Sequence, residues 1–262
     1  MAGGEREGPM EKVIYALWRD DGAGEGDVAA RDAFSAALRG PVAERIAAVG
    51  ARGVQVCADD GAVADAPLRL TTFDRPVSAF VAVWLDRCQG PERRRIEEIL
   101  QSHAGRAEGW LVTESVPMAM PAPDGCGAGA RVRGFTGVAL LRRPDGMDAE
   151  HWRARWQDHH TQVAIDVQGT FGYVQNLVIR AVTDGAPPLA AIVEEQFPDA
   201  AKSDIYAFYG VDRERDDAKA ELKRRTDAMG ASTTTFGAAE KIDVVPTSRY
   251  MPVPPTFGSA FG

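Results

Sequence analysis

The chain has 262 residues, of which 45% are hydrophobic and 26% are charged, and its formal net charge at pH 7 is −8. This composition is ordinary for a globular protein, and the length allows one large domain or two domains of about 100–150 residues. The negative charge argues against a nucleic-acid partner, because a protein that binds phosphate backbones needs a concentrated basic surface.

No apolar run approaches the roughly 18 residues that a membrane-spanning helix requires, and the amino terminus lacks the charged-then-apolar order of a secretory signal. We therefore expect a cytoplasmic protein without a membrane partner. Cys57, Cys88 and Cys126 show no CxxC spacing. They predict free thiols rather than a disulfide framework or a structural zinc site.

The first half of the chain predicts the order strand, helix, strand, strand, helix, strand. A strand-like run at 12–19 precedes a helical pattern that carries Val28, Phe34, Leu38 and Val42. Two short β-like runs follow at 53–56 and 79–85, then a helix that begins near Pro91 and continues to His103, and a strand at 109–116.

The second half repeats this order after a Pro/Gly/Ala-rich linker. It predicts a strand at 134–143, a helix with Asp148 as N-cap, strands at 172–176 and 205–210, a helix from Asp212 to about Met229 and a strand at 240–246. Segment 184–203 is expected to be a long loop whose centre could form a short helix. Such a loop could cover a pocket or be a packing insertion.

The order βαββαβ, found twice, is typical of tandem ferredoxin-like repeats in the α+β class, in which two helices cover one face of a four-stranded antiparallel sheet. The other sheet faces should pack together, which predicts an intramolecular barrel. The expected segments are a flexible N-terminus (1–11), the first repeat (12–116), a linker (117–131), the second repeat (132–247) and an extended C-terminal tail (248–262). The tail could lie on the domain or on a partner subunit, or be disordered.

The stretch HWRARWQDHH (151–160) carries the strongest functional signal. Trp152, Trp156 and His160 recur at intervals of four and share a helical face. Neighbouring helical residues point about 100° apart, so His159 and His160 cannot both face the sheet. We expect His160 to line a pocket and act as a general acid/base, with His159 as a possible helper and His151 at the surface.

A purely structural interpretation of the same stretch stays open. The tryptophans could be ordinary core residues, and the histidines could bond to carbonyl groups in the last helical turn. A metal site is disfavoured, because the spacing differs from HExxH and no carboxylate is clearly placed as a further ligand.

Segment 134–176 resembles the EthD domain family of the dimeric α+β barrel superfamily. The matching positions are Trp152, Trp156, His160, Val163, Ala164, Tyr173, Gln175 and Asn176. The first half resembles the same motif in degraded form, because Arg39-Gly40-Pro41-Val42-Ala43 aligns with 160–164 and places Arg39 where the second half has His160. The resemblance therefore predicts one working pocket, in the second half.

The resemblance implies a cofactor-independent lyase, dehydratase or isomerase that acts on a small hydrophobic, aromatic or polycyclic substrate, without a metal. Trp152 and Trp156 would form the pocket wall. Tyr173, Asn176 and Tyr209 would bind the substrate, although on a regular strand only one of Tyr173 and Asn176 can face the pocket.

Further candidate roles and two rival functions stay open. Arg39 could hold an anionic group in a second pocket, and Asp166 could orient the imidazole of His160. The rival functions are a cofactor-free oxygenase and a non-catalytic carrier of a small molecule. A homodimer is possible.

Overall fold

The computed structural model describes residues 10–255 except 21, 23, 25 and 124–128. Most of the predicted N-terminal segment, part of the predicted linker with Cys126, and the end of the predicted tail therefore lie outside the described residues. Cys57 and Cys88 are buried free thiols. None of the helices in the described part of the chain is long and apolar enough to cross a membrane.

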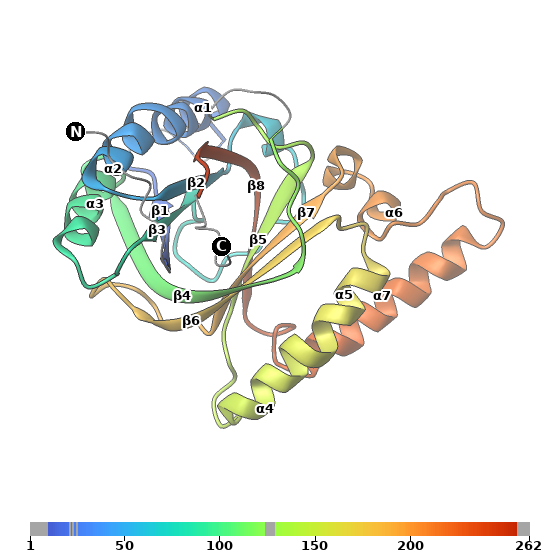
Figure 1. Ribbon diagram of the computed structural model, residues 1–262. Coiled ribbons are helices and arrows are strands. Elements are labelled where there is room, and N and C mark those ends of the chain that lie inside the picture. The colour runs from blue at the N-terminus through green and yellow to red at the C-terminus, as the bar shows by residue number, and fades with distance from the viewer. Residues whose placement is uncertain (1–9, 21, 23, 25, 124–128, 256–262) are drawn as a thin grey trace, which may run out of the picture.

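Eight antiparallel strands form a closed barrel (Figure 1). They are β1 (Glu11–Trp18), β2 (Gly53–Ala58), β3 (Ala79–Leu85), β4 (Arg106–Met118), β5 (Phe135–Leu141), β6 (Gly172–Ala181), β7 (Ala191–Phe197) and β8 (Ile242–Val253). Their order around the barrel is β1-β3-β2-β8-β5-β7-β6-β4, and β4 closes the ring on β1. The predicted α+β fold of tandem ferredoxin-like repeats is confirmed.

Each half of the barrel has the strand order of a ferredoxin-like sheet. The first half runs β4-β1-β3-β2 and the second β8-β5-β7-β6. The last strand of each half pairs with the edge strand of the other, as in the pairs Val56↔Tyr250 and Thr113↔Leu177. Closure leaves no open sheet edge, which removes the unpaired backbone groups that would otherwise invite aggregation.

The helices lie on the outside of the barrel (Figure 1). In the first half they are α1 (Val28–Ala37), the π-helical η1 (Leu38–Val42), α2 (Ala43–Val49) and α3 (Pro91–Gln101), with the short 3₁₀ helix η2 (Gly61–Val63). In the second half they are α4 (Ala149–Arg153), the π-helical η3 (Ala154–His160), α5 (Thr161–Val167), α6 (Ile205–Phe208) and α7 (Ala218–Thr234), with the 3₁₀ helix η4 (Asp199–Lys202).

The predicted start of the α4 helix is confirmed, because the Asp148 carboxylate accepts hydrogen bonds from the backbone amides of Glu150 and His151 at 2.9 and 3.0 Å. The π-helical turns were not predicted. The turn at 154–160 ends at His160, whereas the stretch at 38–42, which contains Arg39, is broken by non-helical backbone at Gly40 (φ −110°, ψ −108°) and is a kink between two helices. A π-turn adds a residue to the helical ladder and often occurs at functional sites.

The predicted strand at 205–210 is wrong, because these residues form α6 and the turn after it. The carboxylate of Asp204 accepts a hydrogen bond from the amide of Tyr206 and caps this helix. The missing strand is β7, which lies inside the segment expected to be a loop. Its backbone pairs with β5 on one side and β6 on the other. The local sequence pattern could not predict this two-sided pairing.

Two further boundaries differ from expectation. The second helix of the second half begins at Ala218 rather than near Asp212. Strand β8 continues to Val253, so residues 248–253 belong to the sheet, although they were expected to have no strand period. The pairing of Ser248, Arg249 and Tyr250 with β2 provides the backbone partners that make this proline-containing segment a strand.

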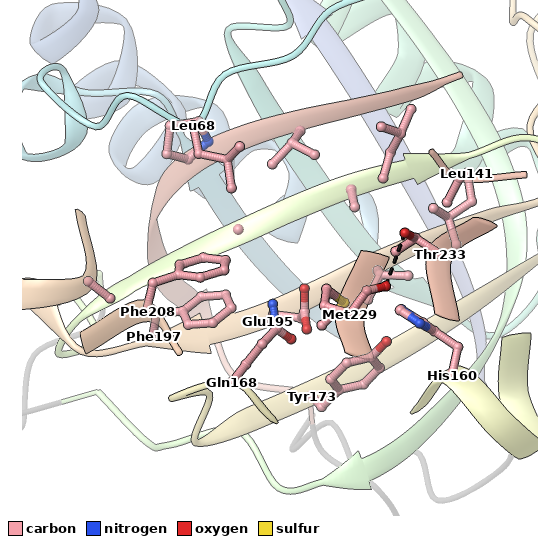
Figure 2. A pocket seen from close by; sticks show the side chains of 18 of the residues that line it. Leu68, Leu141, His160, Gln168, Tyr173, Glu195, Phe197, Phe208, Met229 and Thr233 are labelled. Carbon is pink, nitrogen blue, oxygen red and sulfur yellow. Dashed lines mark hydrogen bonds between the residues drawn. The ribbon is translucent and has the colours of Figure 1, made fainter. Parts of the chain in front are cut away.

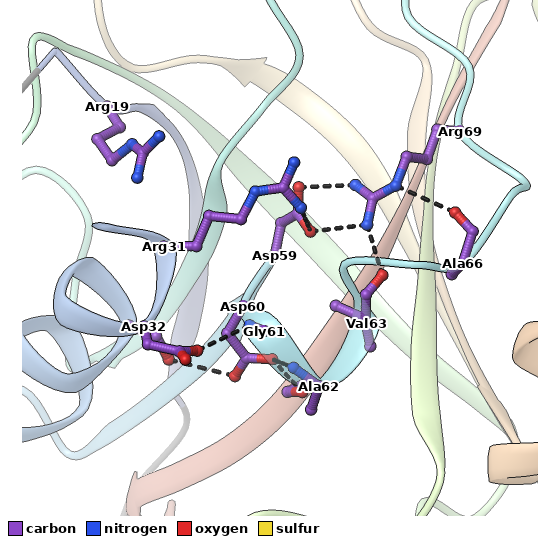
Figure 3. A network of polar contacts seen from close by, with 12 residues as sticks. Arg19, Arg31, Asp32, Asp59, Asp60, Gly61, Ala62, Val63, Ala66 and Arg69 are labelled. Carbon is purple, nitrogen blue, oxygen red and sulfur yellow. Dashed lines mark hydrogen bonds and ion pairs between the residues drawn. The ribbon is translucent and has the colours of Figure 1, made fainter. Parts of the chain in front are cut away.

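A cluster around Asp59 holds the connection between β2 and β3 (Figure 3). The Asp59 carboxylate accepts two hydrogen bonds from Arg69, at 2.7 and 2.9 Å, and one from Arg31 at 3.0 Å. Bidentate arginine–carboxylate pairs fix geometry well. The connection then crosses to the second half, where Leu70 forms an isolated antiparallel bridge with Val244 of β8.

The interior of the barrel is filled, mainly by apolar side chains, among them Ile14, Phe80, Trp84, Trp110 and Val138. A buried polar network crosses this interior between the two halves. Lys12 of β1 forms ion pairs with Glu114 of β4 and, at 3.2 Å, with Glu194 of β7. Glu194 also accepts hydrogen bonds from Gln55 and Asn176. These three partners of Glu194 come from three different strands, β1, β2 and β6.

We predict that Lys12→Met lowers the free energy of unfolding by about 3–5 kcal/mol, the range seen when one partner of a buried ion pair is removed. Burial by itself lowers the pKa of Lys12, but the charges of Glu194 and Glu114 outweigh it and raise the pKa overall. The substitution therefore leaves the buried carboxylate of Glu194 without its ion-pair partner. Urea denaturation measures the effect.

The double variant Lys12→Met/Glu194→Gln is the control, because it also removes the carboxylate charge. It should recover at least half of the lost stability. Equal destabilisation of the single and double variants would contradict an electrostatic origin and would indicate lost packing instead.

Candidate functional site

A cavity of about 210 Å³ lies in the second half, between the outer face of the sheet and the helix layer (Figure 2). Engineered apolar cavities of about 150 Å³ bind benzene, so this one can enclose an aromatic ring. Its walls are mostly apolar: Ala66, Leu68, Phe135, Gly137, Ala139, Leu141, Trp156, Val193, Phe197, Ala201, Phe208, Met229, Phe236, Ala238, Ile242, Val244 and Pro246.

The floor of the cavity consists of rows of side chains that run across the strands. One row contains Tyr173 of β6, Glu195 of β7, Gly137 of β5 and Pro246 of β8, which are consecutive partners in the strand register. Directly opposed residues in antiparallel strands have Cβ atoms about 4.5–5.5 Å apart. The small residue Gly137 beside Glu195 leaves open space above the sheet, where a larger side chain would fill the cavity.

The first half contributes to the opening of this cavity. Ala66 and Leu68, from the connection held by the Asp59 cluster, both line it, and Leu68 is labelled in Figure 2. Leu68 is 45% exposed, a high value for a leucine that also lines a cavity. Lys202 of η4 donates a hydrogen bond to the carbonyl oxygen of Ala62 at 3.0 Å and so ties the opening to the first half.

Two backbone segments, at Gly169 and at 207–208, lie in close contact and close one end of the cavity. The Gly169 amide donates a hydrogen bond to the carbonyl oxygen of Phe208 at 2.7 Å. A Cβ atom on Gly169 would lie 2.3 Å from the carbonyl oxygen of Ala207, so only glycine allows this contact. It brings Phe208 and Tyr209 at the end of α6 against Gln168 at the end of α5, and all three line the cavity.

His160 lies at the end of the π-helical turn and lines the cavity. Its side chain is only 8% exposed, its Nδ1 lies 2.9 Å from the Ser232 hydroxyl, and its ring packs 4.7 Å from that of Phe236. Burial, with a smaller contribution from the charge of His159, lowers the pKa of His160 to about 4. The imidazole is therefore neutral at physiological pH and can accept a proton.

Glu195 is the functional residue that the sequence did not reveal. It lines the cavity, and within the described part of the chain its carboxyl group forms no hydrogen bond or ion pair. Burial raises the pKa of Glu195 to about 8. The adjacent residue Glu194 points into the barrel, so the two carboxyl groups occupy opposite faces of the sheet, as the alternation of a strand requires.

Two other polar atoms in the cavity walls lack partners. The indole Nε1 of Trp156 and the amide Oε1 of Gln168 are buried and have no hydrogen-bond partner among the described residues. Most buried polar groups in native proteins are satisfied, so each unsatisfied one needs an explanation, such as a bound ligand. The Trp156 indole lies close enough to the Tyr173 phenol to lower the pKa of that phenol, so the acceptor Oε1 of Gln168 is the clearer unsatisfied group.

Two tyrosines complete the polar lining. Tyr173 is 1% exposed, and burial, followed by the charge of Glu195, raises its pKa well above the usual value. Burial also raises the pKa of Tyr209. Both phenols are therefore neutral at physiological pH and can donate or accept a hydrogen bond.

Several predicted site residues lie outside this cavity. Trp152 is buried behind it, where its indole donates to the carbonyl oxygen of Phe236 at 3.1 Å. Asn176 points into the barrel and bonds to Glu194, so of Tyr173 and Asn176 only Tyr173 lines the cavity. Arg39 lies over the ring of Tyr250, 4.8 Å from its centroid.

His159 and Asp166 are both exposed. The Asp166 carboxylate accepts a hydrogen bond from Gln162 at 2.7 Å rather than from His160. The space in the first half that corresponds to the cavity is filled by a continuous apolar cluster between the sheet and helices α1 to α3. Within the described residues, no group of three or more His, Cys, Asp or Glu side chains could hold a metal ion.

Comparison with known proteins supports the fold. No protein-family model and no curated protein sequence matches the chain. An anthrone oxidase-like protein of known structure is similar with a TM-score of 0.52 and 12% identity, over 96% of this chain and 97% of that chain. At this identity the similarity shows the fold alone, a closed antiparallel barrel built from two ferredoxin-like halves.

Two other solved structures have lower scores. A protein described as a candidate monooxygenase from Lactobacillus acidophilus NCFM has a TM-score of 0.45 and 12% identity, over 93% of this chain and 96% of that chain. A mutant chlorite dismutase from Candidatus Nitrospira defluvii has a TM-score of 0.43 and 11% identity, over 92% and 90% of the two chains.

The low pKa of His160 predicts a pH dependence of stability. The folded state keeps the imidazole neutral down to about pH 4, whereas the unfolded chain binds a proton near pH 6.5. The unfolded state therefore holds more protons between these values, and this contribution to the free energy of unfolding is complete above pH 6.5 and is lost as the pH falls towards 4. At about 1.4 kcal/mol per pKa unit, the loss amounts to roughly 3 kcal/mol.

The comparison with His160→Gln isolates this effect. The difference in unfolding free energy between wild type and variant, measured in urea at several pH values, should change between pH 6.5 and 4 in favour of the variant. A difference that is independent of pH would contradict a depressed pKa of His160.

Proposed function

We propose that this chain is an acid/base enzyme of the lyase, dehydratase or isomerase type, and that it acts on an uncharged aromatic or polycyclic small molecule bound in the cavity beside His160. The observation that carries the proposal is a neutral, buried imidazole at the wall of an apolar cavity. Such a group can remove a proton from a bound substrate and return it. The EthD-like motif within 134–176 is consistent with this function.

The position of Ser232 supports the role of His160. When Nδ1 donates its proton to the Ser232 hydroxyl, Nε2 carries a lone pair and has the tautomer that a general base needs. Among the described residues, the Ser232 hydroxyl is the sole hydrogen-bond partner of the imidazole. Nε2 thus remains available to a substrate, and Ser232 acts as a positioning residue.

The remaining walls suit a flat, uncharged substrate. The indole of Trp156 and the ring of Phe236 provide apolar surface near the imidazole, and aromatic walls favour flat ligands. Lys202, the one cation that lines the cavity in the described part of the chain, is paired with Asp199 at 3.2 Å. An anionic substrate would therefore find no unpaired positive charge in the lining.

His160→Gln tests the proposal directly. With a substrate found by screening uncharged aryl ketones, lactones and phenols by mass spectrometry, kcat should fall about 10²–10⁴-fold, which is the usual contribution of a general acid/base. Substrate affinity should stay within a few-fold of wild type. His151→Gln is the matched control, because His151 is exposed on the same helix and should leave turnover unchanged.

Each alternative function predicts a different result. Bound but unchanged ligand in the wild-type protein would indicate a carrier, and oxygen consumption during turnover would indicate an oxygenase. Wild-type turnover by His160→Gln would contradict the role of the imidazole.

Ser232→Ala should lower kcat about tenfold with little change in KM, because the imidazole loses its orientation but the cavity keeps its walls. Ser232→Thr should restore most of kcat, since threonine provides the same hydroxyl group. A purely structural role for Ser232 predicts lower stability without this separation of kcat from KM. Steady-state kinetics and thermal unfolding of both variants distinguish the two cases.

A further inference from the structure

Glu195 has an unusual position for a carboxyl group. The side chains of β7 that face the helices are Ala191, Val193, Glu195 and Phe197, whereas the corresponding face of β3 in the first half carries Ala79, Val81, Val83 and Leu85. A carboxyl group thus replaces an apolar residue on the floor of the cavity. Charges withdrawn from water are normally paired, and Glu195, which is partly buried, has no ion-pair partner in the described chain.

The open space around Glu195 lies on one side. Tyr173 flanks it on β6, and Gly137 flanks it on β5 without a side chain. Figure 2 shows Gln168 reaching up towards Glu195, between the Phe197 ring and Tyr173. The unpartnered Oε1 of Gln168 therefore belongs to the same part of the cavity.

We infer that Glu195 binds a carbonyl oxygen of an uncharged aromatic ligand by donating a hydrogen bond from its carboxyl group, and that this carbonyl lies in the part of the cavity that Gln168 also lines. The inference deepens the proposed function by naming the polar group that the substrate presents to the cavity floor. It rests on the proposed function only in placing the ligand in this cavity.

The protonation state agrees with this geometry. Burial keeps Glu195 protonated up to about pH 8. A carboxylic acid donates one hydrogen bond, whereas a carboxylate can only accept. A ligand carbonyl needs a donor and a ligand carboxylate needs a cation, so the neutral acid should select a ketone over a carboxylate of the same shape.

The other titratable groups around the cavity do not supply a competing charge at neutral pH. They are Tyr173 from β6, His160 from η3, Tyr209 after α6 and Lys202 from η4, and the residues of β5, β8 and α7 in the lining include no titratable side chain. Lys202 pairs with Asp199, and the imidazole and both phenols are neutral. Glu195 should therefore dominate any pH dependence of binding between pH 6 and 9.

Isothermal titration calorimetry with 2-acetylnaphthalene provides the test, because this ketone has no group that titrates in the range. Its affinity should be constant from pH 6 to 7.5 and should fall towards tenfold per pH unit above about pH 8, as the donor loses its proton. The isosteric anion 2-naphthoate should bind at least tenfold more weakly at pH 6.5.

Three variants separate the role of the proton from that of the side chain's shape. Glu195→Gln keeps a neutral donor, so its affinity at pH 6.5 should stay within about threefold of wild type and become independent of pH. Glu195→Leu loses the donor and should bind the ketone at least tenfold more weakly. Asp166→Asn, an exposed carboxylate on the neighbouring helix, should leave both affinity and pH profile unchanged.

Three outcomes would overturn the inference. They are ketone binding by wild type that does not depend on pH, tighter binding of 2-naphthoate than of the ketone, and no measurable binding of either compound. These outcomes are distinct from failure of the proposed function. Ketone binding with the expected pH profile in His160→Gln supports the role of Glu195 whether or not wild type turns over a substrate.

Discussion

The reciprocal pairing of the two halves is the constraint on which the rest of the structure depends. Strand β8 pairs with the edge strand β2, and β4 pairs with the edge strand β6. Without the other half, each sheet would therefore have unpaired backbone groups at its edges. Closing the barrel also fills its interior with side chains from both halves. A ligand site of useful size therefore has to form on the outer face, between sheet and helices.

The two outer faces have taken different forms. In the first half, helices α1 to α3 pack on the sheet through a continuous apolar cluster. In the second half, small residues on β5 and the bulky rings on the helices leave space that is only partly filled. The first half nevertheless takes part, because the connection held by the bidentate Asp59–Arg69 pair contributes Leu68 to the opening.

The adjacent glutamates of β7 show how the same residue type acquires opposite properties from its surroundings. Glu194 faces the barrel interior, where Lys12 and Arg249 lower its pKa despite burial. Glu195 faces the cavity, where burial without a positive partner raises its pKa to about 8. With His160 shifted to about 4, the cavity contains a neutral acid and a neutral base at the same pH. Pairs of groups whose pKa values are pushed apart are typical of acid/base catalysis.

The sequence by itself determined the architecture and the helix that carries the candidate base. Hydrophobic periodicity and the repeated element order predicted the barrel, because they reflect the burial of one face of each strand and helix. They placed one strand of the second half wrongly, at 205–210 instead of Ala191–Phe197. The spacing of Trp156 and His160 likewise placed both on one helical face, and both line the cavity. These patterns are local, so they can be recognised without the tertiary structure.

Only the tertiary structure decided which carboxyl group enters the cavity. The run Ala191–Phe197 has no clear period of its own, and it becomes a strand because β5 and β6 pair with it on both sides. That pairing turns Glu194 inward and Glu195 outward, and the surrounding burial then sets their opposite pKa shifts. Long-range strand pairing and desolvation depend on residues far apart in the chain, and for that reason no local pattern could predict them.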